Sequence, residues 1–200
     1  MAAEATLFRS SSHMRRMGVA VALGAAVAFA IMQPRPTLDV PQDVPEEVQD
    51  LVDATWDSYL AAFPAQRQCI GSVTVVLVRS VEGGAASYRA ADRTISVEIP
   101  TTPERFPESL AHELGHHLES ACGAQERLGE AFLDVQGLPR DVPWSRGRYW
   151  FEIPSEYFAE AVAEIVNGER ITHPDVITLE PAAIELVAAW GHSGSVPATP

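Results

Sequence analysis

The stretch His112-Glu113-Leu114-Gly115-His116 decides how this chain of 200 residues is interpreted. Residues four positions apart lie on one face of a helix, so His112 and His116 can point ring nitrogens at a single metal ion. Glu113 lies beside His112, where its carboxylate can reach a metal-bound water and take its proton. The H-E-x-x-H pattern therefore predicts a zinc ion held by both histidines, with Glu113 as the general base.

The flanking residues predict that this pattern lies on an amphipathic helix. Apolar side chains recur at Leu110, Leu114 and Leu118, which is the spacing of one helix face. Pro107 suits the first helical turn, and Gly123 suits the position that follows the last turn. The alternative is a surface helix with a polar stripe, and this apolar face disfavours it.

A catalytic zinc needs a third protein ligand and one open position. One common pattern continues with a glycine and a third histidine. Here those two positions hold Glu119 and Cys122. That pattern is therefore excluded in its usual form, and a Cys122 thiolate is left as one alternative ligand. Glu130 and Asp134 form a further candidate pair, but they come early in the chain and follow the expected helix end at Gly123.

The segment 154–162, Pro-Ser-Glu-Tyr-Phe-Ala-Glu-Ala-Val, is the better candidate for the third ligand. Ser155 suits a helix N-cap, and Asn167-Gly168 suits the end of that helix. Glu156 and Glu160 lie four apart on one face. One of them can therefore bind the metal, while the other accepts a hydrogen bond from a ligand histidine. A solvated helix face is the alternative for each glutamate.

Together these features resemble the gluzincin metallopeptidases, and among them the lethal-factor-like and proline-proline endopeptidase group, over residues 70–167. In that group a later helix of the form E-x-F-A-E-A supplies the third zinc ligand through its first glutamate, which implies Glu156 here. The resemblance also implies that Tyr149 donates a hydrogen bond to the tetrahedral intermediate, and that the fold is zincin-like. His117 lies about 100° further around the helix than the second histidine, so we interpret it as a flanking residue and not a ligand.

The remaining patterns predict a compact α+β domain over residues 46–190, with a small sheet beside the two metal-binding helices. A periodic apolar stripe predicts a helix over 46–63, and a last helix begins at Pro181. Runs rich in β-branched residues predict strands over 72–80 and 94–99. The second run, 94–99, is the candidate edge on which an extended peptide would lie, with an ordinary core strand as an equal alternative.

Residues 124–148 contain repeated proline and glycine. They predict a loop-rich connection between the metal-binding helices, with a short helix around 126–135. Trp144 and Trp150 are candidates to line the cleft, and aromatic packing is the alternative for both.

Residues 17–32 form an uncharged apolar run that Arg15 and Arg16 precede. This pattern is typical of an export signal whose positive end stays in the cytoplasm. Ala28-Phe29-Ala30 offers a cleavage site, and the run is also close to the length of a membrane span. A cleaved signal peptide over 1–33 and an uncleaved membrane anchor are therefore both open, and either places the domain outside the cytoplasm.

The two cysteines, Cys69 and Cys122, fit an exported domain. Their even count predicts a disulfide, with two free buried thiols as the alternative. Residues 34–45 are rich in proline and predict an extended linker. Residues 191–200 are rich in glycine, serine and proline and predict a disordered tail.

Composition limits the partners of the chain. It has 14 basic and 27 acidic residues, no lysine and a formal net charge of −13, which disfavours nucleic acid as a partner. We expect an exported zinc-dependent endopeptidase that acts on a peptide or protein substrate, in an undetermined oligomeric state. Two alternatives stay open: a zinc-stabilised, non-catalytic binding domain of the cell envelope, and a zinc amidase that acts on a non-protein substrate.

Overall fold

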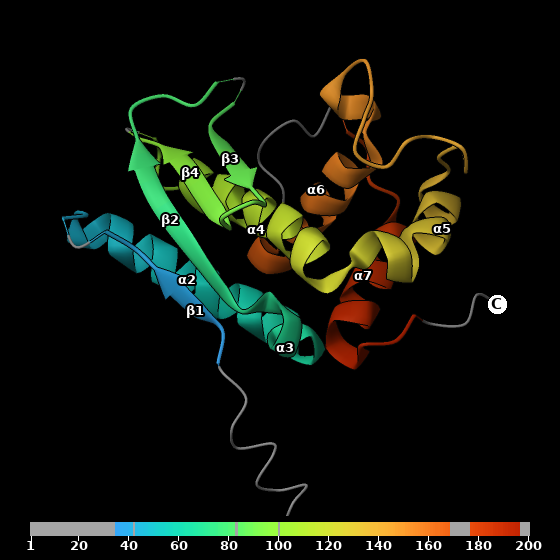
Figure 1. Cartoon of the computed structure of the whole chain (residues 1–200), viewed down its shortest axis with the longest axis horizontal. Coiled ribbons are helices and arrows are strands. Elements are labelled where there is room, and N and C mark those ends of the chain that lie inside the picture. The colour runs from blue at the N-terminus through green and yellow to red at the C-terminus, as the bar shows by residue number, and fades with distance from the viewer. Residues whose placement is uncertain (1–34, 42, 83, 100, 169–176, 197–200) are drawn as a thin grey trace, which may run out of the picture. The chain divides into compact units, whose positions relative to one another are not determined.

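The computed structural model describes residues 35–41, 43–82, 84–99, 101–168 and 177–196. Within these ranges the chain forms an α+β fold, as the sequence predicts (Figure 1). The strands are β1 (Thr37–Asp39), β2 (Ser72–Val78), β3 (Ala86–Arg89) and β4 (Thr94–Glu98). The α-helices are α2 (Glu46–Ala62), α3 (Arg67–Ile70), α4 (Arg105–Cys122), α5 (Ala124–Gln136), α6 (Pro154–Asn167) and α7 (Pro181–Ser193). Two short 3-10 helices are η1 (Pro64–Gln66) and η2 (Trp150–Glu152).

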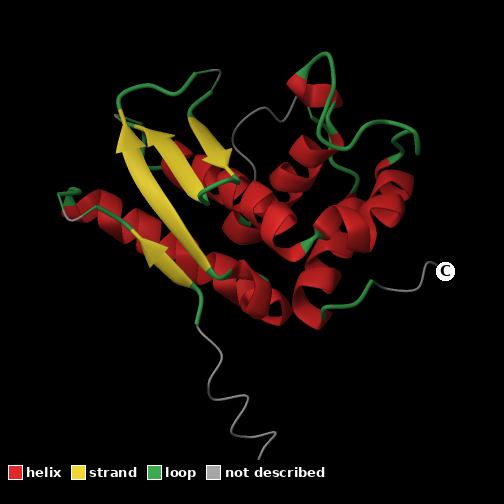
Figure 2. Ribbon diagram, viewed as in Figure 1, coloured by secondary structure: helices red, strands yellow, loops and turns green. Residues whose placement is uncertain are grey.

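The sheet has the strand order β1-β2-β4-β3. β1, β2 and β4 are parallel, and β3 pairs with β4 in the antiparallel direction, with Tyr88 opposite Ile95. Figure 2 shows the strands on the left of the view, where α2 overlaps them, and α5, α6 and α7 on the right. The strands predicted over 72–80 and 94–99 are confirmed as β2 and β4, whereas β3 was not predicted.

Of the two interpretations of 94–99, the substrate edge is wrong and the ordinary core strand is confirmed. β4 lies between β2 and β3, so both of its sides are hydrogen-bonded, and β3 is the edge strand. The alternating burial of Ile95 and Val97 reveals which face of a strand is covered. It carries no information about how many neighbours the strand has.

The prolines of residues 34–45 do not make that whole stretch a linker. Thr37–Asp39 forms β1, in which Leu38 lies opposite Val73, and the compact unit begins at Arg35. A three-residue strand at a sheet edge tolerates prolines close by. At the other end, α7 begins at Pro181 as predicted but continues to Ser193, into the stretch expected to be a disordered tail.

Helix α4 is the centre of the domain, because it packs against β3 and β4 on one side and against α6 on another. The predicted apolar face is confirmed, since Leu110, Leu114 and Leu118 are fully buried. Gly123 adopts the left-handed conformation (φ 64°) and ends the helix as predicted. The helix predicted over 46–63 is confirmed as α2.

Two further predictions concern segments on either side of these elements. The helix expected around 126–135 is longer, because α5 follows Gly123 directly. In the described part of the chain, none of the helices has an apolar stretch of the length that a membrane span needs. The apolar run over 17–32, with the signal or anchor that it predicts, lies outside the described residues.

Candidate metal centre

A close contact between α4 and α6 brings the two sequence motifs together in space. A side chain on Gly115 would place its Cβ 2.7 Å from the Cα atom of Ala159. Glycine is therefore required where the two backbones cross, because any larger residue would push the helices apart. The crossing sets Glu156, in the first turn of α6, opposite the histidines of α4.

His112, His116 and Glu156 form a cluster that could hold a metal ion. The Nε2 atom of His112 lies 3.2 Å from Glu156 Oε2, and the Nε2 atom of His116 lies 3.5 Å from Glu156 Oε1. One possible ligand atom from each residue lies within 4.8 Å of the other two. Two imidazoles and one carboxylate are a donor set that suits zinc.

The other nitrogen of each imidazole also has an oxygen partner. His112 Nδ1 lies 3.3 Å from Glu160 Oε1, as expected for a glutamate that orients a ligand histidine. His116 Nδ1 lies 3.2 Å from Ser155 Oγ, and that hydroxyl donates to Glu119 Oε2 at 2.6 Å. When the rings are neutral, these contacts favour the proton on Nδ1 and leave both Nε2 lone pairs directed at the cluster.

The partners of His116 were missed in the sequence. Ser155 is not a helix N-cap, because Ile153 holds that position and no side chain caps α6. Glu119 also accepts a hydrogen bond from Trp144 Nε1 at 2.7 Å, so buried Trp144 supports the site from behind and does not line an open cleft. Glu119 lies three residues after His116, a spacing at which helical side chains meet, and that signal could have found it.

Two of the alternative third ligands, Cys122 and Asp134, are engaged in other bonds. The Cys122 sulfur is bonded to Cys69 and has no thiolate to offer. Asp134, on α5, is bound to Arg140 at 2.6 Å. Among the described residues, Glu156 is the carboxylate that completes a cluster with the two histidines.

The carboxylates around the imidazoles strongly favour a cation in this cluster. Burial would lower the pKa of His112, but hydrogen bonds to Glu156 and Glu160 outweigh it and raise that pKa to about 10. Burial likewise opposes protonation of His116, yet Glu119 and Glu156 raise its pKa to about 9. For Glu156, burial acts to raise the pKa, and the two histidines lower it to about 2. A metal ion at this position would replace the protons of the imidazoles.

Glu113 is buried beside the cluster, with 7% of its surface exposed. Burial raises the pKa of its carboxyl, and the neighbouring histidines His112 and His116 partly offset that effect. The backbone of Tyr88 near the carboxyl also acts to lower this pKa. A carboxylate with a raised pKa, close to a metal site, is suited to accept a proton.

A cleft runs between edge strand β3 and helix α4 and passes the candidate metal centre. It is lined on the strand side by Ala85, Ala86, Ser87 and Tyr88, and on the helix side by Glu108, Ser109, His112, Glu113 and His116. Glu156 and Glu160 from α6 also line the cleft, and Trp150 does so as predicted. The strand that borders the site is therefore β3 and not β4.

Tyr149 is not brought into this cleft. Its ring is 46% exposed, stacks on Phe151 at 5.2 Å and lies under the guanidinium of Arg148. The structure thus brings together His112, Glu113, His116, Glu156 and Glu160, while the role of Tyr149 stays a prediction.

His117 is directed away from the cluster, as predicted for a flanking residue. It is fully buried, with Nε2 2.9 Å from the Ile70 carbonyl and Nδ1 3.1 Å from the Tyr88 hydroxyl. Burial lowers the pKa of His117 to about 4, and the hydrogen bond to Ile70 opposes that shift only in part. The side chain is therefore neutral at physiological pH.

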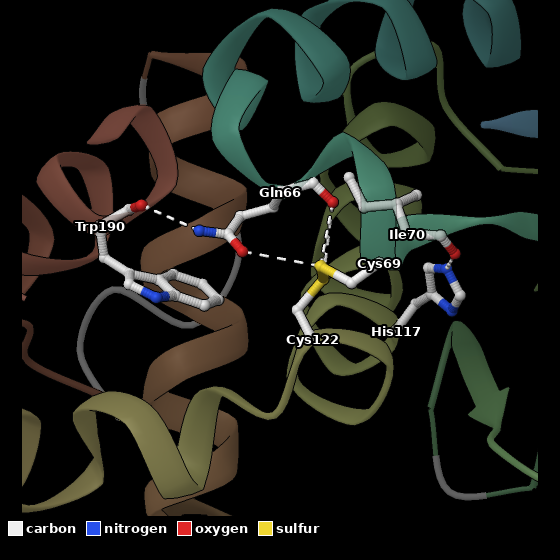
Figure 3. The surroundings of a disulfide bond; sticks show 6 residues. All are labelled: Gln66, Cys69, Ile70, His117, Cys122 and Trp190. Carbon is white, nitrogen blue, oxygen red and sulfur yellow. Dashed lines mark hydrogen bonds between the residues drawn. A yellow bond between two sulfur atoms is a disulfide. The ribbon is translucent and has the colours of Figure 1, made fainter. Parts of the chain in front are cut away.

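The predicted disulfide between Cys69 and Cys122 is present, with the two Cα atoms 5.1 Å apart. Figure 3 shows it between α3 and the end of α4, next to Gln66. This bond is compatible with a location outside the cytoplasm.

Comparison with known proteins gives no match: no family model, no curated protein and no solved structure matches this chain.

Proposed function

We propose that the protein is a zinc-dependent endopeptidase with a zincin-like catalytic domain of the gluzincin type. The observation that supports this best is the cluster itself: His112 Nε2 and His116 Nε2 both face the carboxylate of Glu156. The carboxyl of Glu113, buried in the same cleft, supplies a general base. A metal site that served only to stabilise the fold would have no need of that base.

A bound zinc ion would lower the pKa of a coordinated water and polarise the substrate carbonyl. Glu113 takes the proton from the attacking water and then passes it to the leaving amine. Glu160 holds the ring of His112 through Nδ1, and Ser155 with Glu119 holds the ring of His116. Fixed imidazoles keep the metal-facing nitrogens in place throughout the reaction.

An extended peptide is the substrate that this cleft fits best. β3 is an edge strand, and backbone groups on its free side can pair with a peptide by strand addition. The peptide would lie between β3 and α4, with its scissile carbonyl beside Glu113 and with Trp150 across the cleft.

Tyr149 remains in the proposal as a hydrogen-bond donor to the oxyanion. It belongs to the same short segment as Trp150, which does line the cleft. Its ring would have to turn from Phe151 toward the substrate when a peptide binds, which is a change that loops at active sites commonly make.

We further propose that the protein is exported, either by a cleaved signal peptide or by an uncleaved anchor over residues 17–32. The Cys69–Cys122 disulfide supports an oxidising location.

The test of the proposed activity is cleavage of a peptide library by the wild type and by Glu113→Gln. Gln has the shape of Glu but cannot accept the proton, so we expect cleavage to fall by about 100-fold or more while the metal stays bound. Glu185→Gln, an exposed change on α7, is the matched control and should cleave like the wild type. Equal cleavage by Glu113→Gln would remove the proposed base. A metal-loaded wild type that cleaves no peptide would favour a binding domain or an amidase.

A further inference from the structure

Both ring nitrogens of His117 are used in hydrogen bonds that leave its tautomer no freedom. A carbonyl oxygen only accepts, so Nε2 must carry the proton that is donated to Ile70, at 2.9 Å. Nδ1 of the neutral ring then has a lone pair and accepts from the Tyr88 hydroxyl at 3.1 Å. The Ile70 carbonyl therefore fixes the proton on Nε2 and leaves Nδ1 as the acceptor for the Tyr88 hydroxyl.

One end of this chain of hydrogen bonds is held rigidly. Ile70 follows Cys69 directly, and the disulfide from Cys69 ends on the last residue of α4, the helix that carries His117. Figure 3 shows the Ile70 carbonyl against the His117 ring beside this bond. On the other side of the corner, the buried Gln66 side chain donates to the Trp190 carbonyl of α7 at 3.0 Å.

The other end of the chain lies on the edge strand. Tyr88 belongs to β3, which among the described strands pairs with β4 alone. Its ring meets the His117 ring edge-on, with centroids 5.5 Å apart. Tyr88 also lines the cleft together with Glu113 and His116. The place of Tyr88 therefore affects both the strand edge and the proposed base.

We propose that His117 is a positioning residue that fixes edge strand β3 against helix α4. The disulfide corner holds the Ile70 carbonyl, the carbonyl sets the tautomer of His117, and His117 holds Tyr88 through its hydroxyl. Through Tyr88, the strand is kept at the distance from α4 at which a peptide can pair with it. The role of a peptide rests on the proposed function, whereas the fixing of β3 does not.

The tautomer is measured first, by ¹⁵N NMR of the histidine rings in the full-length protein at neutral pH. We expect one buried, neutral imidazole with its proton on Nε2. A His117 ring with its proton on Nδ1, or a charged ring, would overturn the proposal, because Tyr88 could then not donate to it.

The position of β3 is measured by amide hydrogen exchange in Tyr88→Phe and His117→Gln. The terminal amide of Gln can still donate to the Ile70 carbonyl, so this variant keeps that buried oxygen satisfied. Loss of the hydroxyl contact should speed exchange of the β3 amides by between about twofold and tenfold. Tyr59→Phe is the matched control, since the buried Tyr59 hydroxyl has no hydrogen-bond partner among the described residues. Wild-type exchange of β3 in Tyr88→Phe would contradict the proposal.

Peptide cleavage gives a separate readout. A displaced strand weakens binding of the peptide before and during the reaction alike, so the same variants should raise KM more than they lower kcat. A loss confined to kcat would mean that His117 does not act through the strand. If no peptide is cleaved even by the wild type, the proposed function fails, while the exchange and NMR results still decide the role of His117.

Discussion

His116 and His117 are neighbours on one helix, yet the two faces of α4 give them opposite properties. Carboxylates of Glu119 and Glu156 overcome burial and raise the pKa of His116 to about 9. Burial beside an uncharged carbonyl lowers the pKa of His117 to about 4. The imidazole of His116 thus favours a bound proton or cation, whereas the imidazole of His117 favours the neutral form with a hydrogen bond at each nitrogen. The surrounding elements, and not the residue type, decide which.

Helix α4 thus has one face that could hold a metal ion, the metal face, and another that supports the fold, the stability face. α6 meets the first face with Ser155, Glu156 and Glu160. The second face meets β3 and the disulfide corner through His117 and Cys122. Changes on the two faces should therefore have separable effects.

The largest effect on the stability face is expected from removal of the disulfide. The double change Cys69→Ser/Cys122→Ser frees a loop with a sequence separation of 53 residues. It should lower the free energy of unfolding by about 4 kcal/mol, which urea unfolding will measure. Reductant should bring the wild type to the same value and leave the double variant unchanged. An unfolding free energy equal to that of the oxidised wild type would show that the corner does not depend on the bond.

A smaller effect on the same face is expected from pH. The folded pKa of His117, about 4, lies below the ordinary value of 6.5, so the unfolded chain takes up the proton first as pH falls. His117 therefore contributes full stability above pH 6.5, and the wild type should lose about 3 kcal/mol relative to His117→Gln between pH 6.5 and 4. The measurement is the difference in unfolding free energy between the two proteins across this range. A difference that does not change with pH would refute the assigned environment.

The smallest of these three effects is expected from Ser155→Ala on the metal face. Ser155→Ala removes the hydroxyl between His116 and Glu119, and metal affinity should fall by about 10- to 100-fold. Ser145→Ala is the matched control, because Ser145 is exposed and lines the pocket beside Ser155. Competition with a zinc chelator gives the affinities. Equal affinities for the two variants would mean that Ser155 does not support His116.

The parts of the site that lie within one helix could be predicted from the sequence. The spacings of His112 with His116 and of Glu156 with Glu160 are properties of a single helix, and both helices formed where their patterns indicate. Contacts between elements could not be predicted in the same way. Ser155 meets Glu119 across 36 residues of chain, and only the crossing of α4 and α6 reveals it.

The edge strand and the tyrosine show two other limits. β3 has the sequence Ala-Ser-Tyr-Arg, in which tyrosine alone favours strands, so its conformation depends on pairing with β4. The turn between β3 and β4 contains Arg93 with a positive φ of 54°, and no sequence motif predicts that conformation for an arginine. The position of Tyr149 follows local stacking on Phe151, and the spacing to Glu156 carries no information about that contact.

The central claim is that His112, His116 and Glu156 bind one zinc ion, and metal content tests it most directly. Purified wild type, Glu156→Ala and the control Glu164→Ala would be equilibrated with limiting zinc and subjected to elemental analysis. Glu164 lies on the same helix and outside the cluster. We predict about one zinc per chain in the wild type and in Glu164→Ala, with a clear loss in Glu156→Ala. A folded wild type without zinc, or equal zinc in Glu156→Ala, would contradict the claim.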